Sequence, residues 1–169
     1  NEQTKNAYQE ALSTSAVYES SVSSLSEDYF DLYYVDVETG EYVEYGSRTR
    51  KGQRSVENRG ADFFAETLKN AKVYIFEEDL ESFQAALNKE KFLDEIRKHG
   101  FYRYRYRLMI DGNPTYVSMK ATQINEDNRH IIIGISNIDS QVKGALAAKR
   151  AIEERKSYQR LSALNGNLS

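Results

Sequence analysis

Residues 101–107, FYRYRYR, alternate aromatic rings with guanidinium groups, and both chemical groups bind nucleic acids. Bases stack on aromatic rings, and guanidinium groups pair with phosphates. In a β-strand, however, successive side chains point to opposite faces of the sheet. One face would take Tyr102, Tyr104, Tyr106, Leu108 and Ile110, and the other would take Arg103, Arg105, Arg107 and Met109. Because a nucleic-acid-binding sheet presents rings and cations on one surface, the alternation favours an ordinary half-buried strand.

Binding of single-stranded nucleic acid is therefore the alternative function and not the favoured one. Further cations for it would come from the segment 46–60, which we expect to be a solvated loop and which contains Arg48, Arg50, Lys51 and Arg54. The net charge of −3 leaves the chain without the strong positive field of a dedicated nucleic-acid binder. We expect the arginines of the 101–107 strand to pair with carboxylates, for which Glu10 and Glu19 are candidates.

Two groups of carboxylates have the chemistry to bind a metal ion or to exchange protons: Asp28, Asp31 and Asp36, and Glu77, Glu78 and Asp79. Neither group has the spacing of a calcium-binding loop. Helix capping and solvation account for both groups, and Asp79 is placed to cap a following helix. The chain also has no phosphate-binding glycine motif and no serine nucleophile motif. The sequence therefore predicts no catalytic residue and no metal site.

Cysteine is absent from the chain, and the two histidines are His99 and His130. The absence of cysteine excludes disulfides, thiolate metal sites and a cysteine nucleophile, and it fits a reducing compartment. His99 precedes a glycine that ends a helix, and His130 lies in a turn, so we expect both histidines at the surface. No apolar run approaches the ~18 residues that span a bilayer. We therefore predict a cytoplasmic location.

The hydrophobic spacing predicts the elements that position these residues. A helix is expected over residues 5–25, followed by a hairpin over 31–47 with its turn at residues 38–41. Helical spacing then runs through residues 61–99 and ends at Gly100. Three strands follow at 101–110, 114–124 and 130–139, with Pro114 in the turn between the first two. From Ser140 onward the chain is rich in helix formers.

Two strands, several short helices and three further strands form the chain order of a PAS domain. The sequence resembles the PAS sensor modules that occur in tandem ahead of diguanylate cyclase and histidine kinase domains in gut Firmicutes. The matching segments are YYVDVETGEYVEY at 33–45, ADFFAETLKNAKVYIFEEDLESF at 61–83, YRLMIDGNPTYVSMKAT at 106–122 and IIIGISNIDSQVK at 131–143.

This resemblance implies an α+β fold. Its core would be a five-stranded antiparallel sheet with helices on one face that enclose a small cavity, and the flanks would be an N-terminal helix and a long C-terminal helix. It divides the chain into a helix at 1–27, a PAS-like domain at 28–139 and a last segment at 140–169. This last segment would contain a signalling or linker helix and the start of a following module. The implied function is sensing or dimerisation, without catalysis. Signals would pass through the C-terminal helix to an output domain for cyclic-di-GMP turnover or a kinase.

The resemblance also bears on cofactors and ligands. Flavin photosensors of this fold use a reactive cysteine, which this chain lacks. Haem sensors of this fold use a histidine on a helix that lines the pocket. Because we expect both histidines of this chain at the surface, haem binding is not favoured. The ligand and any cofactor stay open. Candidate pocket residues come from the inward strand face and the middle helices, where a filled core is the favoured interpretation: Tyr34, Tyr45, Phe64, Leu68, Phe83, Leu87, Tyr104, Tyr106, Ser118 and Ile133.

The C-terminal helix carries scattered apolar residues without a sustained heptad repeat: Val142, Leu146, Ile152, Leu161 and Leu164. A short parallel contact between two copies of the chain is expected there, and this contact would support a homodimer.

Overall fold

The structure is a computed structural model that describes residues 29–48, 54–124 and 127–167. The helix expected over residues 1–27 lies outside these ranges, as do Asp28, Arg50 and Lys51. The chain divides into two compact units after Asn137. The first unit contains a β-sheet and its covering helices, and the second is a single helix.

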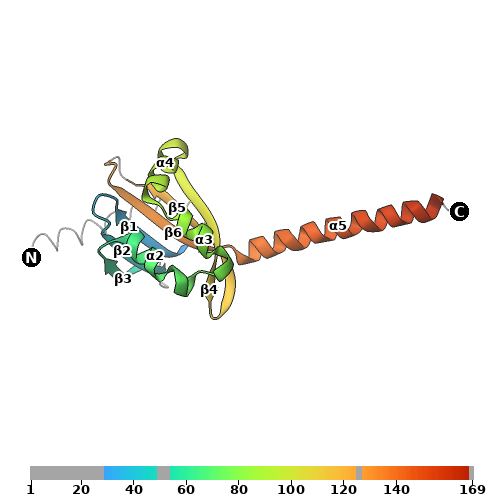
Figure 1. Cartoon of the computed structure of the whole chain (residues 1–169), viewed down its shortest axis with the longest axis horizontal. Helices are drawn as coiled ribbons and strands as arrows, with labels where there is room; N and C mark the ends of the chain where they lie inside the picture. The colour runs from blue at the N-terminus through green and yellow to red at the C-terminus, as the bar shows by residue number, and fades with distance from the viewer. Residues whose placement is uncertain (1–28, 49–53, 125–126, 168–169) are drawn as a thin grey trace, which may run out of the picture. The chain divides into compact units, whose positions relative to one another are not determined.

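The sheet of the first unit has six antiparallel strands in the order β3-β2-β1-β6-β5-β4 (Figure 1). The strands span Tyr29–Asp36 (β1), Tyr42–Arg48 (β2), Arg54–Gly60 (β3), Phe101–Ile110 (β4), Asn113–Gln123 (β5) and His130–Asn137 (β6). The first strand therefore pairs with the last one at the centre of the sheet. The hairpin and the three later strands predicted from sequence are all present.

The prediction of five strands was wrong, because β3 is a sixth. It lies in the segment that we expected to be a solvated loop, and it pairs with β2 at the edge of the sheet. Val56 is its only large apolar side chain, so its sequence has no alternating pattern. Cross-strand pairing to β2 forms this strand in spite of its weak intrinsic preference.

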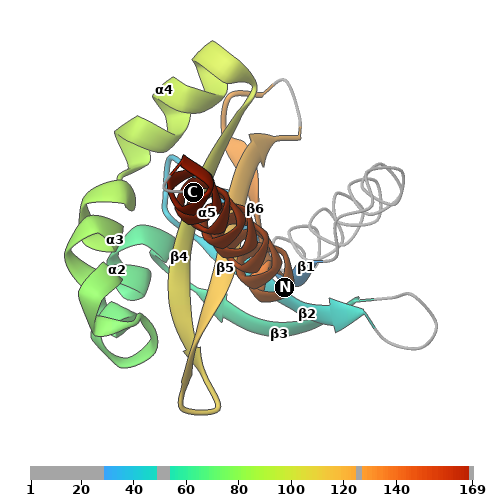
Figure 2. The same cartoon turned by 90° about the vertical axis from the view of Figure 1, so that its right-hand side faces the viewer.

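Four short helical segments follow β3 and lie on one side of the sheet (Figures 1 and 2). They span Phe63–Tyr74 (α2), Glu77–Asp79 (η1), Leu80–Ala86 (α3) and Lys89–His99 (α4). The Asp62 side chain caps α2 by accepting a hydrogen bond from Ala65 N, and Asn88 caps α4 in the same way. Gly100 ends α4 with a φ of 86°, as predicted.

The main core lies between these helices and the sheet. Phe63, Phe83 and Phe92 pack there against Val35 and Tyr106 of the strands. A second, smaller cluster contains no helical residue: Tyr29, Leu32, Tyr34, Val43, Tyr45 and Ile132. In β1, Leu32 and Tyr34 alternate with Tyr33 and Val35 of the main core, so this second cluster is on the opposite face of the sheet. Within it, the ring of Tyr29 covers Gly134, where an added Cβ atom would overlap the ring.

The two-faced interpretation of β4 is confirmed from Tyr102 to Tyr106, whereas Met109, expected on the arginine face, lines a cavity together with Tyr106 and Leu108. Tyr102 and Tyr106 are buried in the main core, and Arg103 and Arg105 are exposed. Tyr104 and Leu108 pack against the same core.

Arg107 pairs with a carboxylate, as expected, but its partner is Asp79, which departs from its predicted role as a helix cap. Asp79 holds the N-cap position of α3, but its side chain makes no capping hydrogen bond. Its carboxylate instead accepts hydrogen bonds from the backbone N of Arg107 at 2.8 Å and from its guanidinium at 2.7 and 2.9 Å. Phe76 N donates to the Arg107 carbonyl in turn. An edge strand leaves a row of backbone N–H and C=O groups without partners. The segment around η1 supplies such partners along the outer edge of β4.

Pro114 also differs from its predicted place in a turn. The turn between β4 and β5 consists of Asp111 and Gly112, both with positive φ, and Pro114 lies within β5 opposite Met109. The Asp-Gly pair is itself the usual sequence for a two-residue hairpin turn, so no proline is needed to form it.

The second unit is the helix α5, Asp139–Asn167. It begins one residue before the predicted start, and Asp139 forms an ion pair with Lys143 at 2.8 Å in its first turn. Five large apolar side chains are exposed along it: Leu146, Ile152, Tyr158, Leu161 and Leu164. Among the residues that the structure describes, no helix has the length and apolar character needed to cross a membrane.

Candidate functional site: an acidic, aromatic cavity beside α2

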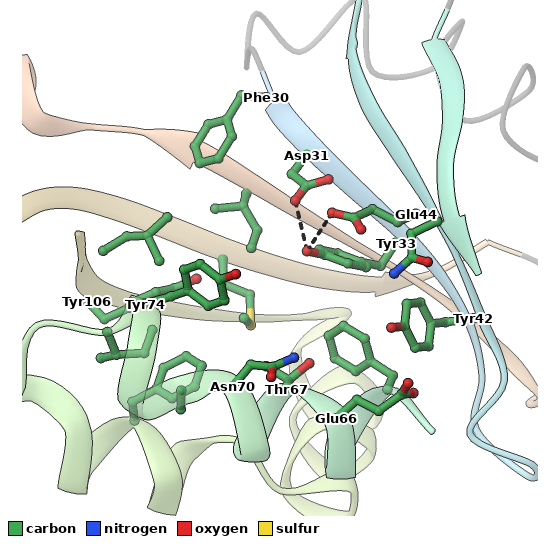
Figure 3. Close-up of a pocket in the computed structure, with 18 of the residues that line it drawn as sticks. Phe30, Asp31, Tyr33, Tyr42, Glu44, Glu66, Thr67, Asn70, Tyr74 and Tyr106 are labelled. Carbon is green, nitrogen blue, oxygen red and sulfur yellow. Dashed lines mark hydrogen bonds between the residues drawn. The ribbon is translucent and has the colours of Figure 1, made fainter. Parts of the chain in front are cut away.

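A cavity of about 400 Å³ lies between α2 and the sheet (Figure 3). Its polar lining consists of Asp31, Tyr33, Tyr42, Glu44, Asn58, Glu66, Thr67, Asn70, Tyr74 and Tyr106. Its apolar lining consists of Phe30, Phe63, Ala71, Ile75, Phe83, Leu108, Met109, Met119 and Ile135. Aromatic rings and carboxylates thus dominate the walls. None of these described lining residues is Lys, Arg or His.

Asp31, Tyr33 and Glu44 meet at one end of the cavity. Asp31 and Tyr33 are two residues apart in β1 and share a face, and Tyr33 pairs with Glu44 across the hairpin. The Tyr33 hydroxyl lies 2.8 Å from Asp31 Oδ2 and 3.0 Å from Glu44 Oε2 (Figure 3). A phenol has only one hydrogen to donate. One of the two carboxyls must therefore carry its own proton for both contacts to be hydrogen bonds.

Glu57 of β3 adds a third carboxylate to this group. Carboxylate oxygens of Asp31, Glu44 and Glu57 lie within 4.8 Å of one another. Asp31 Oδ1 is buried and has no hydrogen-bond partner among the described residues. Burial, the hydrogen bond with Glu44 and the negative charge of Glu44 together raise the pKa of Asp31 to about 8. The Asp31–Glu44 pair therefore keeps an additional proton near neutral pH, and the raised pKa of Asp31 favours that residue as its site.

The surroundings of Tyr33 raise the pKa of its hydroxyl, as they raise that of the Asp31 carboxyl. Burial and the charges of Asp31 and Glu44 raise the pKa of Tyr33 well above its usual value. The phenol therefore keeps its proton and serves as a hydrogen-bond donor to the carboxylates.

Tyr42 and Glu66 lie on the same side of the cavity as these carboxylates and extend the lining toward the first turn of α2. The Tyr42 and Tyr33 rings are 6.1 Å apart between their centroids. The Glu66 carboxylate accepts a hydrogen bond from Asp62 N at 2.8 Å, which fixes it at the first turn of α2. The Tyr42 ring packs edge-on against Phe63, with 5.7 Å between ring centroids. An added Cβ atom at Gly60 would overlap this ring, so glycine at position 60 gives Tyr42 its place.

The deeper wall is apolar. Tyr106 is 4% exposed and packs against Phe83 at 4.8 Å between ring centroids. Burial, followed by the charge of Asp31, raises the pKa of Tyr106. The cavity thus has a polar, acidic end toward β1 and β2 and a predominantly apolar wall toward α3 and β4–β6.

The predicted pocket residues fall in several places. Phe83 and Tyr106 line the cavity. Phe64, Leu68, Leu87, Tyr104 and Ile133 belong to the main core or pack against it without lining the cavity. Tyr34 and Tyr45 lie in the cluster on the opposite face of the sheet. Ser118 lies between the core residues Val117 and Met119 in β5, so its side chain also points to the opposite face, where it accepts a hydrogen bond from Arg103. A role in ligand binding stays a prediction for all ten residues.

Sequence reasoning missed the polar end of the cavity. Spacing and composition predict a solvated carboxylate at Asp31 and do not single out Tyr33 or Glu44. The available signal was the hairpin register: once the turn is placed at residues 38–41, Asp31, Tyr33, Tyr42 and Glu44 fall on one face.

A second, more open hollow lies on the other side of β1, beside the Tyr34 ring. His130 stacks on this ring at 4.9 Å and contacts Asp127 at 2.6 Å, and its side chain is 15% exposed. The prediction of a surface position is therefore wrong for His130, because the stacking covers its ring. His99 does lie at the surface, and neither histidine lines the acidic cavity.

No protein-family profile matches the chain, and no curated protein matches it. Among solved structures, it is similar to an RNA-binding light-oxygen-voltage receptor, with 12% sequence identity and a TM-score of 0.38 over 75% of this chain. The match covers 33% of the receptor chain, so this chain spans about a third of that length.

The strand order itself gives the fold class. Without β3, the order β2-β1-β6-β5-β4 places two early and three late strands in one antiparallel sheet, with the helices between them in the sequence. This is the arrangement of two early and three late strands that the resemblance to PAS domains implied. The sixth strand is added at the edge next to β2 and leaves this arrangement intact.

Proposed function

We propose that this chain is a non-catalytic sensory module that binds a small molecule in the cavity beside α2. The observation that carries the proposal is the group of half-buried polar side chains, Asp31, Tyr33 and Glu44, at one end of a cavity of about 400 Å³. Burying a carboxylate costs free energy unless the carboxylate gains a hydrogen-bonding or charged partner. Small-molecule sites in proteins generally combine apolar walls with a few convergent polar groups, as this cavity does. The volume is within the usual range for small-molecule sites.

The proposal includes a signalling path through α5. Exposed leucine and isoleucine side chains on this helix suit a contact with a second copy of the chain, as a homodimer requires. An output domain for cyclic-di-GMP turnover or a kinase would follow, as in the tandem modules of gut Firmicutes that the sequence resembles. A cytoplasmic location is part of the same proposal.

The alternative, binding of single-stranded nucleic acid, requires rings and cations on one surface. Tyr102 and Tyr106 are buried, whereas Arg103 and Arg105 are exposed on the other face of β4. This separation argues against the alternative. Salt-dependent retardation of an oligonucleotide by the purified chain would instead support the alternative.

A cavity-filling variant tests the sensory function. Thr67→Trp places a large ring in the cavity from α2, and Val73→Trp adds the same ring at a site on α2 that is 70% exposed. A small-molecule library is screened by thermal shift on the natural sequence, and hits are repeated on both variants. We expect the shift to be lost in Thr67→Trp and kept in Val73→Trp. A library without any hit, or hits that bind Thr67→Trp unchanged, would contradict the proposal.

A further inference from the structure

The charge of the cavity restricts its ligand. Asp31, Glu44 and Glu66 contribute carboxylates to the lining, Glu57 lies beside the first two, and no described lining residue carries a positive charge. Bringing an anion into this space would add like charges to a site of low polarity. A cation would instead compensate carboxylates that are partly withdrawn from water.

The balance of hydrogen-bond donors and acceptors beside the carboxylates restricts the ligand further. Tyr33 has one hydrogen for the two carboxyls that it contacts, and Asp31 Oδ1 has no partner among the described residues. The site thus has more acceptors than donors. A protonated amine brings three N–H donors, whereas a quaternary ammonium brings none.

The volume of the cavity and its aromatic and apolar walls fit an organic cation better than a bare metal ion. A volume of about 400 Å³ holds an organic molecule, and the rings of Tyr33, Tyr42 and Tyr74 surround the space beside the carboxylates (Figure 3). Aromatic rings attract cations through the negative charge of their faces. The apolar wall of Phe83, Tyr106 and Met119 suits a hydrocarbon or aromatic substituent.

Resting on the proposed function, we propose that the cavity binds a small primary amine, with its ammonium group at Asp31 and Glu44 and its apolar part toward Phe83 and Tyr106. Binding would take the place of the proton that Asp31 holds in the unbound protein, and this proton would pass to solvent. The groups that face Asp31 are Tyr33 of its own strand, Glu44 of β2, Glu57 of β3 and Tyr106 of β4. All four are acidic or phenolic, so among the described residues the ammonium ion meets no competing cation there.

Calorimetry with matched probes tests this inference. A panel of primary amines, from propylamine to 2-phenylethylamine, is titrated into the purified chain beside the corresponding neutral alcohols and trimethylammonium analogues. Calcium and magnesium chloride form a further arm. We expect at least one amine to bind, and its alcohol and trimethylammonium analogues to bind at least tenfold more weakly. Proton release, measured in buffers of different ionisation enthalpy, should accompany amine binding near neutral pH.

Two variants locate the ammonium group. Asp31→Asn should weaken amine binding at least tenfold and abolish proton release. Glu81→Gln removes one negative charge from an exposed site on α3 and should leave both unchanged.

The outcomes separate this inference from the sensory function. Equal binding of amine and alcohol, binding of the metal ions without amines, or no binding across the panel would overturn the amine assignment. The comparison of probes on the natural sequence holds even if Asp31→Asn fails to fold. The sensory function would still stand if a neutral or anionic compound bound the natural sequence and lost its binding in Thr67→Trp.

Discussion

Asp79 holds Arg107 by three hydrogen bonds, one to its backbone amide and two to its guanidinium. The Arg107 guanidinium also lies over the Phe76 ring, 4.5 Å from the ring centroid. A single carboxylate thereby joins the helical segment η1 to the edge strand β4. This contact covers backbone groups of the edge strand and fixes the segment between α2 and α3, both of which contribute to the cavity wall.

Loss of this carboxylate should destabilise the fold. We expect Asp79→Asn to lower the free energy of unfolding by about 1.5–3 kcal/mol, the range for hydrogen bonds to charged groups. The measurement is urea denaturation near neutral pH. Asp94→Asn is the control, because Asp94 forms exposed ion pairs with Arg97 and Lys98 that contribute little. Equal effects of the two substitutions would show that the Asp79 contact has no special role.

The raised pKa of Asp31 predicts an unusual dependence of stability on pH. Its pKa is 3.8 ordinarily and about 8 in the folded chain, so between these values the folded state binds a proton that the unfolded state has lost. The free energy of unfolding should therefore fall as pH rises from about 5 to 8, by up to about 1.4 kcal/mol per pH unit. Asp31→Asn should flatten this slope. Denaturant melts of both proteins across this range provide the check, and parallel slopes would argue against a proton on Asp31.

Removal of the Tyr33 hydroxyl should also act in a pH-dependent way. Tyr33→Phe leaves Asp31 and Glu44 without their shared donor, which we expect to cost about 1–3 kcal/mol of unfolding free energy above about pH 8. At lower pH the loss should be smaller, because a protonated Asp31 can donate to Glu44. Tyr158→Phe, at a site that is 74% exposed, serves as the control in the same melts. A loss that does not change with pH would contradict the proposed sharing of one hydrogen.

Gly60 and Tyr42 should behave as an energetically coupled pair. Gly60→Ala places a methyl group where the Tyr42 ring lies, so we expect a loss of about 1–3 kcal/mol from overpacking. Tyr42→Leu removes the ring, and in the double variant the added methyl group should cost much less than in Gly60→Ala alone. A double-mutant cycle in denaturant melts measures the coupling. Additive effects would mean that the ring moves aside without cost.

The sequence was sufficient for the elements with strong periodic patterns. The strands around residues 101–137, the end of α4 at Gly100 and the two faces of β4 follow from alternation and from the backbone freedom of glycine. β3 was missed because its residues carry little pattern, and only pairing with β2 makes it a strand.

Side-chain partners were harder to predict than elements. Asp79 satisfies the sequence rule for a helix cap, yet a charged partner from β4, distant in the sequence, takes its carboxylate. An aspartate such as Asp31 is expected in solvent from its residue type, and only the fold brings it beside Glu44 and Glu57. Such roles depend on contacts between segments, which local patterns do not encode.

Gly134, which lies under the ring of Tyr29, has a consequence for evolution. The two positions share one volume at the junction of the first and last strands, so each limits what the other can become. A homologue with a larger residue at position 134 should carry a smaller one at position 29. Correlated substitution at these two sites would help to identify distant relatives whose overall sequence similarity has been lost.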